Sequence, residues 1–246
     1  MELVGKVAIV TGGAVRLGKA FALALATRGV RLAIHYGASA GAAQEVVSRI
    51  SKISDAVAIQ ADLRQSDQAV SVIERAVAHF GQVDILVNNA AIFEPGNWAD
   101  TTETSWDKHF AINLKAPFFL SQAFAAHLGR ERRGHILNIS DWRAIRPAAD
   151  HLAYTLTKAG LISMTQNLAL ALAPNIQVNA VAPGAILPPP GQDAAYLDRL
   201  ARTIPARRYG SPADVEKALL FLLDSDFITG EVILVTGGQH LVGDKS

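Results

Sequence analysis

Short runs of apolar, β-branched residues alternate along the chain with longer segments in which apolar side chains recur at helical spacing. The short runs are mostly continuous in their apolar character, which is typical of parallel strands covered by helices on both faces. They predict seven strands, at residues 7–10, 31–35, 56–60, 84–88, 135–140, 176–181 and 231–235.

The segments between these runs predict helices, and several begin or end at residues that favour helix termini. Gly29 is placed to end the first helix. Ser39 and Ser66 are placed to cap the second and third helices, and Ser211 to cap the last, with a proline in its first turn. The proline-rich stretch 183–192 predicts a loop. We expect helices at residues 16–28, 40–52, 67–80, 102–128 (with a break or bend near Pro117), 151–172 and 212–224.

This alternation predicts a Rossmann-like, doubly wound α/β fold with a parallel seven-stranded sheet. A chain of 246 residues with 50% hydrophobic content can bury one large core. Because no repeat, low-complexity tract or linker divides the sequence, we expect a single domain over residues 1–246.

Composition narrows the range of functions. The net charge is +1, so neither nucleic acid nor a membrane surface is an expected partner. The absence of cysteine excludes disulfides, thiolate metal sites and cysteine nucleophiles, and the seven histidines lack metal-ligand spacing, so no metal is expected. The chain shows neither a signal-peptide pattern nor an apolar run of ~18 residues, which predicts a cytoplasmic protein.

A glycine-rich turn, TGGAVRLG, follows the first strand. Glycines let the backbone turn tightly and approach a pyrophosphate, and the N-terminus of the following helix supplies free N–H groups. An ordinary strand-to-helix turn is the alternative, but its place at the first strand of the sheet favours nucleotide binding. The expected cofactor contacts are Thr11, Gly12, Gly13, Arg16, Leu17 and Gly18.

The end of the second strand predicts which dinucleotide binds. An acidic residue there would hold the ribose 2′-hydroxyl of NAD, but the sequence HYGAS contains none. Ser39 offers a hydroxyl and N–H groups to a 2′-phosphate, and it can cap the helix at the same time. Arg16 is the nearest cation in the sequence. We therefore expect NADP(H) as cofactor, with contacts from His35, Tyr36 and Ser39.

Three further strand ends carry residues that fit the same cleft, because open α/β sheets bind ligands at the carboxyl ends of their strands. Asp62 could accept a hydrogen bond from an adenine amino group. Small residues after the fourth strand would let the backbone approach the cofactor, although the two asparagines there could equally form a simple turn. The expected contacts are Asp62, Leu63, Asn89, Ala90, Ala91, Pro183 and Gly184.

A tyrosine and a lysine, Tyr154 and Lys158, lie one helical turn apart in the sequence YTLTK. Residues at i and i+4 share a helix face, so the ammonium group can lie beside the phenol. The positive charge is expected to lower the pKa of the phenol from its ordinary value of about 10 and so equip it for proton transfer. Such a pair is common on amphipathic helices, so its meaning depends on its surroundings, including Asp141, thirteen residues before the tyrosine.

With these motifs in this order, the chain resembles the short-chain dehydrogenase/reductases over essentially its whole length. The resemblance rests on TGGAVRLG, Asp62, NNAA, Asn113, the Tyr154/Lys158 pair and Pro183-Gly184. It implies an oxidoreductase that forms a homotetramer and has a substrate lid of variable sequence at about residues 186–208. The implied catalytic residues are Asn113, Tyr154 and Lys158, and the implied cofactor contacts include Ser140, Tyr154 and Lys158.

Two departures from the usual family pattern resemble the pteridine reductases, a branch that includes dihydromonapterin and dihydrofolate reductases. Arg16 stands where most members carry a glycine, and Asp141 stands where most carry the catalytic serine. Phe93 matches the aromatic residue that stacks on the pterin in that branch. Ala38 and Ala91 depart from it, since an arginine is often found at the first position and a serine could touch the pterin at the second. The implied substrate contacts are Arg16, Phe93, Asp141 and Tyr154, with Asp141 also catalytic.

The chemistry of Asp141 supports the same branch. A pterin carries a 2-amino group beside a ring N–H, and a carboxylate can accept both hydrogen bonds, whereas a serine cannot. The leading hypothesis is an NADPH-dependent reductase of a pterin or folate C=N bond, with Tyr154, backed by Asp141 and Lys158, relaying the proton. One alternative is a carbonyl reductase for 3-oxoacyl, sugar or steroid substrates, which Asp141 disfavours because a carboxylate repels a carbonyl oxygen. The other is a non-catalytic nucleotide-binding protein, which the intact tyrosine, lysine and Asn113 disfavour.

Overall fold

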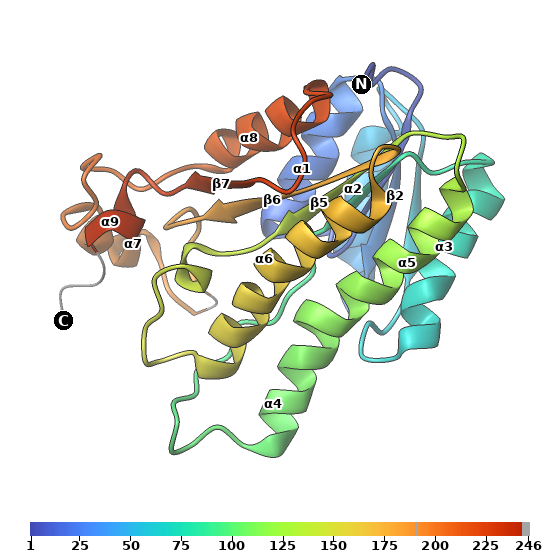
Figure 1. Cartoon of the computed structure of the whole chain (residues 1–246). Coiled ribbons are helices and arrows are strands. Elements are labelled where there is room, and N and C mark those ends of the chain that lie inside the picture. Colours follow the sequence, from blue (N-terminus) through green and yellow to red (C-terminus); the bar gives the residue numbers. More distant parts are fainter. Residues whose placement is uncertain (190, 243–246) are drawn as a thin grey trace.

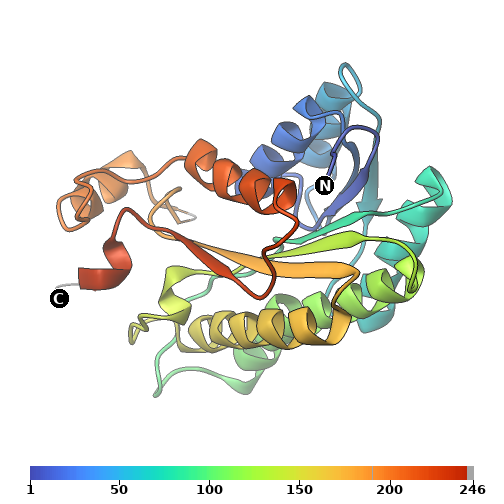
Figure 2. The same ribbon diagram turned by 45° about the horizontal axis from the view of Figure 1, so that its top comes forward.

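The computed structural model describes residues 1–189 and 191–242. A parallel sheet runs through the centre of the molecule, with helices on both faces (Figure 1, Figure 2). Its strand order is β3-β2-β1-β4-β5-β6-β7, and every neighbouring pair is parallel. The predicted doubly wound α/β fold is confirmed. The strands are β1 (Val7–Val10), β2 (Arg31–Tyr36), β3 (Ala56–Gln60), β4 (Ile85–Asn88), β5 (Gly134–Ile139), β6 (Ile176–Pro183) and β7 (Val232–Val235).

The strand order reverses between β1 and β4, which are neighbours in the sheet although three helices and two strands separate them in the sequence. The chain leaves β1 toward one side of the sheet and leaves β4 toward the other. In an open α/β sheet, ligands bind outside the carboxyl ends of the strands at such a reversal. Because the topology favours ligand binding where β1, β4 and β5 end, we call this region the cleft.

Two layers of helices cover the sheet. The helices α1 (Arg16–Thr27), α2 (Ala40–Ile50) and α8 (Pro212–Asp224) pack on one face. The helices α3 (Ser66–Phe80), α5 (Ala116–Leu128) and α6 (Leu152–Leu172) pack on the other. Shorter helices α4 (Glu103–Phe110), α7 (Ala194–Ala201) and α9 (Gln239–Val242) follow β4, β6 and β7. Among the helices that the structure describes, none is long and apolar enough to cross a membrane.

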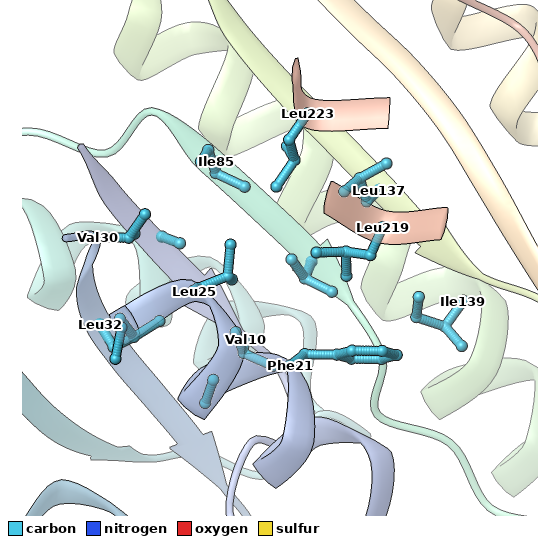
Figure 3. Close-up of a cluster of buried hydrophobic side chains, with 14 of the residues drawn as sticks. Val10, Phe21, Leu25, Val30, Leu32, Ile85, Leu137, Ile139, Leu219 and Leu223 are labelled. Carbon is cyan, nitrogen blue, oxygen red and sulfur yellow. The ribbon is translucent and has the colours of Figure 1, made fainter. Parts of the chain in front are cut away.

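The two helix layers pack on separate apolar cores because successive residues of a strand point to opposite faces. In β1, Ala8 and Val10 belong to the core beneath α1, α2 and α8, part of which is shown in Figure 3. Val7 and Ile9 belong to the core beneath α3 and α5. All four side chains are 0% exposed. Burial on both faces is the reason that this strand has a continuous apolar sequence.

The helix predicted over residues 102–128 is broken into three parts. A π-helical turn, Ala111–Lys115, separates α4 from α5. Pro117 lies in the first turn of α5, and its nitrogen cannot donate a hydrogen bond to the carbonyl of Asn113, four residues earlier. The predicted break near Pro117 is therefore present, and it brings Asn113 into the wide turn.

Several helix and loop boundaries differ from the prediction. Ser66 is the first residue of α3 rather than its cap. Ser39 occupies the N-cap position of α2, but its hydroxyl makes no capping hydrogen bond. Ser211 is the N-cap residue of α8 as predicted, and its N–H donates to the Asp214 carboxylate at 2.9 Å. The apolar pattern does not predict α7, which falls in the predicted lid segment, because its single buried side chain, Leu197, gives too weak a signal. Residue 190, in the predicted loop, lies outside the described residues.

Candidate active site

The glycine-rich turn after β1 has a backbone that only glycine fits well. Gly12 has a φ of 61°, and a Cβ atom there would lie 3.1 Å from Cα of Ala90. A Cβ atom on Gly18 would lie 2.1 Å from the carbonyl oxygen of Gly12, so the first turn of α1 packs directly on the loop. The N-cap residue of α1, Val15, has no side-chain oxygen to cap the helix. The N–H groups at this helix end are thus free of a side-chain cap and can bind an anion.

Thr11 and Asn89 join the end of β1 to the end of β4. The Thr11 hydroxyl oxygen accepts hydrogen bonds from the backbone N–H groups of Asn89 (2.9 Å) and Ala90 (3.0 Å). The Asn89 side-chain amide donates to the Thr11 carbonyl at 2.8 Å. Asn89 therefore holds the glycine-rich turn through its side chain, and Ala91, two residues on, is exposed.

The predicted residues after β2 and β3 fall into two groups. His35 is buried beneath the glycine-rich turn, so its imidazole contacts the turn and not the open cleft. Leu63 is also buried, with 6% of its surface exposed. Tyr36 is half-buried and Ser39 is exposed, where a ligand can reach them. Asp62 forms an ion pair with Arg64, whose Nη2 lies 2.6 Å from the carboxylate, and this pair lowers the pKa of Asp62.

Asp141 and Tyr154 are in direct contact. The Tyr154 hydroxyl donates a hydrogen bond to Oδ2 of Asp141 at 2.9 Å, and Oδ1 of the same carboxylate accepts from the backbone N–H of Arg143 at 2.8 Å. Asp141 follows the end of β5 and is the N-cap of a 3₁₀ turn, Trp142–Ala144, while Tyr154 lies in the first turn of α6. The 3₁₀ turn after β5 and the first turn of α6 thus bring the predicted carboxylate–phenol pair together.

Lys158 lies behind the phenol and is buried. Its ammonium group is 5.7 Å from the centre of the Tyr154 ring and donates a hydrogen bond to the Ile139 carbonyl at 2.6 Å. Ser140, also buried, donates from its hydroxyl to the Lys158 carbonyl at 3.1 Å. These bonds tie α6 to the carboxyl end of β5, and they put the lysine charge close to both Asp141 and the phenol.

The direction of the tyrosine pKa shift corrects the sequence prediction. Burial, followed by the negative charge of Asp141 and the hydrogen bond to it, raises the pKa of Tyr154 well above its ordinary value. Burial lowers the pKa of Lys158 to about 8, with the Asp141 charge opposing the shift, and burial raises the pKa of Asp141 against its hydrogen bonds to Arg143 and Tyr154. The lysine does not make Tyr154 acidic in this state. The tyrosine is held as a phenol that can donate its proton.

Asn113 lies in the π-helical turn and is fully buried. Its side-chain oxygen accepts from the N–H of Ile92 at 2.9 Å, and its amide donates to the Ile92 carbonyl at 3.0 Å and to the Thr157 hydroxyl at 3.2 Å. Thr157 in turn donates to the carbonyl of Tyr154 at 2.7 Å. Through its side chain, Asn113 therefore positions the β4–α4 loop and the start of α6 relative to each other.

Phe93 lies beside Tyr154, but one face of the Phe93 ring is already covered. Its ring stacks on the imidazole of His151, with the centres 3.9 Å apart and the planes at 5°, and it meets the Tyr154 ring edge-on at 4.7 Å. Sequence reasoning assigns His151 no special role. The available signal is its spacing, three residues before Tyr154 at the N-cap of α6. Its neighbour Asp150 binds the guanidinium of Arg143, which connects this stack to the loop holding Asp141.

Arg16 and Gly184 join the glycine-rich turn and the end of β6 to neighbouring segments of the chain. Arg16 has a φ of 52°, and its guanidinium donates to the Pro188 carbonyl at 2.8 Å. It therefore reaches from the glycine-rich turn to Pro188, which follows β6. Pro183 ends β6 and is buried, and a Cβ atom on Gly184 would lie 2.8 Å from the side-chain oxygen of Gln239. Leu17, at the start of α1, is half-buried and packs against the core below that helix.

No group of three or more histidine, aspartate or glutamate side chains in the described part of the chain is arranged to hold a metal ion. The chemistry of the cleft rests on a buried phenol, a carboxylate and an ammonium group beside a glycine-rich turn. This arrangement can transfer a proton to a substrate while a redox cofactor is bound at the glycine-rich turn.

Comparison with known proteins assigns the family. The family model described as enoyl-(acyl carrier protein) reductase matches residues 13–240, and the chain belongs to the short-chain dehydrogenase/reductase family. It is an oxidoreductase of that family. The resemblance seen in the sequence is thereby confirmed.

The relatives differ in their substrates. The granaticin polyketide synthase putative ketoacyl reductase 2 of Streptomyces violaceoruber is 32% identical over 243 residues, with 96% of each chain covered. The 3-oxoacyl-(acyl-carrier-protein) reductase FabG of Staphylococcus epidermidis is 34% identical over 242 residues, covering 96% of this chain and 99% of that one. Among solved structures, FolM alternative dihydrofolate reductase 1 from Brucella canis, complexed with NADP, has a TM-score of 0.94 and 33% identity, covering 99% of this chain and 97% of that one.

Proposed function

We propose that this protein is an NADPH-dependent reductase of a pterin or folate C=N bond. The observation that carries the proposal is the buried contact between Asp141 and Tyr154, in which the phenol donates to the carboxylate at 2.9 Å. The likeness to a dihydrofolate reductase of the same family, at a TM-score of 0.94, supports it.

The cleft has the features that NADP(H) needs. The left-handed Gly12, the close packing at Gly18 and the uncapped start of α1 fit a pyrophosphate. Exposed Ser39 would hold the 2′-phosphate, and Lys158 the nicotinamide ribose. The complex of the FolM relative with NADP supports this choice of cofactor. When bound, the cofactor would supply the hydride.

Asp141 would recognise the pterin by its edge. An ionised carboxylate has about four lone-pair directions, and in the structure two of them accept hydrogen bonds from Tyr154 and the Arg143 backbone. The others would accept the 2-amino group and a ring N–H of the substrate in a charge-assisted pair. Phe93 would stack on the flat ring through the face opposite His151. The Arg16 guanidinium would then move from the Pro188 carbonyl to the pyrophosphate and the pterin edge.

The chain would supply the proton through Tyr154. Reduction of C=N places a proton on nitrogen, and the phenol, whose pKa is raised, holds a proton to donate. The Lys158 ammonium, 5.7 Å from the ring centre, would stabilise the phenolate that forms, and Asp141, once protonated, would return a proton to that phenolate. Asn113 would keep α6 in position during this transfer.

The competing enzyme function is reduction of a 3-oxoacyl or related carbonyl group. Two relatives named as ketoacyl or 3-oxoacyl reductases favour it. Asp141 weighs against it, because a carboxylate repels the oxygen of a carbonyl and cannot donate to it when ionised. A non-catalytic nucleotide-binding role would not explain why Asp141 and Lys158 both lie close to the Tyr154 side chain.

One assay separates these functions. NADPH oxidation should be measured with dihydropterins, quinonoid pterins, dihydrofolate and acetoacetyl thioesters as substrates. We expect the highest kcat/KM with a pterin or folate. A clear preference for acetoacetyl thioesters would replace the proposal with a carbonyl reductase, and NADPH binding without turnover of any substrate would support the non-catalytic role.

We also propose that the protein is a cytoplasmic homotetramer with two-fold symmetry, as the family resemblance implies. Apolar side chains are exposed along α5 and α6, including Phe118 (39% exposed), Leu156 (42%) and Leu170 (84%). These side chains would be covered by a second copy. Light scattering at micromolar concentration should give the mass of four chains, and a monomer would contradict this assembly.

A further inference from the structure

His35 connects three separate segments at the cofactor end of the cleft. Its Nδ1 accepts a hydrogen bond from the backbone N–H of Gly12 at 3.1 Å, and its Nε2 lies 3.1 Å from the Ala61 carbonyl oxygen after β3. Its own carbonyl accepts from the N–H of Gly13 at 3.0 Å. One residue of β2 therefore binds both consecutive glycines of the β1–α1 turn, and only 3% of its surface is exposed.

These partners fix the protonation of the imidazole. A backbone N–H can only donate and a backbone carbonyl can only accept, so Nδ1 must lack a proton and Nε2 must carry one. His35 is thus neutral, in the Nε2–H tautomer, with both ring nitrogens satisfied. A second proton on Nδ1 would face the N–H of Gly12 and remove the hydrogen bond that holds the turn.

We propose that His35 is a positioning residue that keeps the glycine-rich turn in its cofactor-binding shape, and that its protonation releases the turn and weakens NADP(H) binding in acid. The inference rests on the proposed cofactor but not on the proposed substrate. The backbone of Gly12 needs this support because glycine can adopt many φ values besides the 61° that it has here. Glycine has no side chain that restricts φ. Loss of the acceptor for the Gly12 N–H would therefore let the turn change its shape.

Among the described residues, no charged side chain is a cause of the pKa shift of His35. The charged residues that follow β3, Asp62 and Arg64, bind each other, and Arg16, the one charged residue in the turn sequence TGGAVRLG, binds the Pro188 carbonyl. On the α1 and α2 side, Lys19 and Glu45 also form an ion pair. Burial is the main cause that lowers the pKa of His35 from 6.5, and the bond to Ala61 opposes it.

The sign of the pH effect follows from that lowered pKa. At neutral pH the folded protein holds His35 neutral, so the turn is intact. As the pH falls below 6.5, the ordinary value, unfolded chains take up this proton first, and folded-state stability declines. When the pH reaches the lowered pKa of the folded protein, Nδ1 is protonated and the turn is released. NADP(H) affinity should therefore be constant around neutrality and fall only in acid.

The experiment compares NADP⁺ affinity across pH in the full-length protein and three variants. His35→Gln replaces the imidazole with an oxygen that can accept from Gly12 and an amide that can donate to Ala61, but it cannot titrate. His35→Leu puts an apolar side chain of similar size in place of the imidazole, and it removes the hydrogen bonds to Gly12 and Ala61. His135→Gln is the matched control, because His135 is also 3% exposed but lies at the amino end of β5, far from the cofactor end of the sheet.

In wild type, the Kd for NADP⁺ should rise up to about tenfold per pH unit below the His35 pKa, in addition to the change caused by the 2′-phosphate itself. The phosphate contribution is the same for every variant, so the ratio of Kd values isolates His35. His35→Gln should bind as tightly as wild type at neutral pH and lose the extra acid rise. His35→Leu should bind roughly tenfold to a hundredfold more weakly at every pH. His135→Gln should retain the wild-type profile.

Two results would overturn the inference while leaving the proposed function intact. One is a His35→Gln variant that retains the full acid rise, and the other is nitrogen NMR showing a proton on Nδ1 at neutral pH. The NMR measurement needs no variant, so it decides the matter even if His35→Leu fails to fold. Wild-type protein that does not bind NADP⁺ would overturn both proposals. Binding of NADP⁺ without pterin turnover would refute the proposed substrate alone.

Discussion

The cofactor end of the cleft is held mainly by backbone groups, whereas the substrate end is held by side chains that contact one another. Around Gly12, the Thr11 hydroxyl and the His35 imidazole bind main-chain N–H or carbonyl groups of neighbouring segments. Around Asp141, the decisive contacts are a phenol on a carboxylate and a phenylalanine on an imidazole. One end depends on glycines and strand order, which a whole family can share. The other depends on a few side chains, which can change without changing the fold.

This difference explains why overall similarity leaves the substrate open. The chain is 34% identical to a 3-oxoacyl reductase and 33% identical to a dihydrofolate reductase, so global identity does not separate the two chemistries. Substitutions at the substrate end should therefore change turnover and specificity while leaving cofactor binding intact. Substitutions at the cofactor end should do the reverse.

The largest effect is expected from Tyr154→Phe. Removing the hydroxyl removes the proton donor, so turnover should fall by about 10²–10⁴-fold, the usual contribution of a positioned acid. NADP⁺ affinity, measured by calorimetry, should stay at the wild-type value because the glycine-rich turn is untouched. Tyr209→Phe, just before α8 and outside the predicted lid, provides the control. Near-normal turnover in Tyr154→Phe would mean that another group supplies the proton.

A second large effect is expected when the lysine charge is lost with rising pH. Lys158 is an ammonium below its pKa of about 8 and neutral above it. As the pH rises through that value, the phenolate formed in the reaction loses its stabilising cation, so kcat should fall on the alkaline side. A pH profile of kcat at saturating NADPH and substrate measures this. A kcat that stays level well above pH 8 would show that the lysine charge is not required.

Asp141→Ser should cost the pterin reaction roughly 1.5–3 kcal/mol, about tenfold to a hundredfold in kcat/KM, because a charge-assisted two-point contact becomes one neutral contact. NADPH binding should not change, and slow reduction of simple ketones or thioesters should rise. Asp141→Asn is the matched variant, since it keeps the shape but offers a single carbonyl oxygen. If Asp141→Ser retained full pterin activity, the carboxylate would not be the pterin anchor.

The smallest effect concerns cofactor choice. Wild type should prefer NADPH to NADH in kcat/KM, because no acidic residue follows β2 and Ser39 is exposed there. Adding a cation by Ala38→Arg should widen the preference on the order of tenfold, since a guanidinium can bind the 2′-phosphate. The same change should not affect the ranking of substrates. Equal rates of wild type with the two cofactors would contradict the NADPH assignment.

The sequence predicts the cofactor end better than the substrate end, for a physical reason. Continuous apolar runs identify strands that are buried on both faces, and glycines at a strand end identify a tight turn, because both signals are local. The pKa of Tyr154 is not local. Its direction depends on burial by the whole sheet-to-helix packing and on Asp141, so the i, i+4 lysine alone gives the wrong sign. The stacking of Phe93 on His151 likewise joins two loops that are distant in sequence.

The π-helical turn at Ala111–Lys115 has a consequence for how the chain tolerates length changes. Such a turn contains one more residue than an α-helical turn, and one residue corresponds to about 100° of rotation around a helix axis. Deleting Ile112 would let α4 and α5 merge into one regular helix, with α4 rotated relative to the site. Asn113 would then leave the pocket formed by Ile92 and Thr157. A single-residue deletion between α4 and α5 would therefore displace Asn113 and lower turnover more than many substitutions inside the cleft.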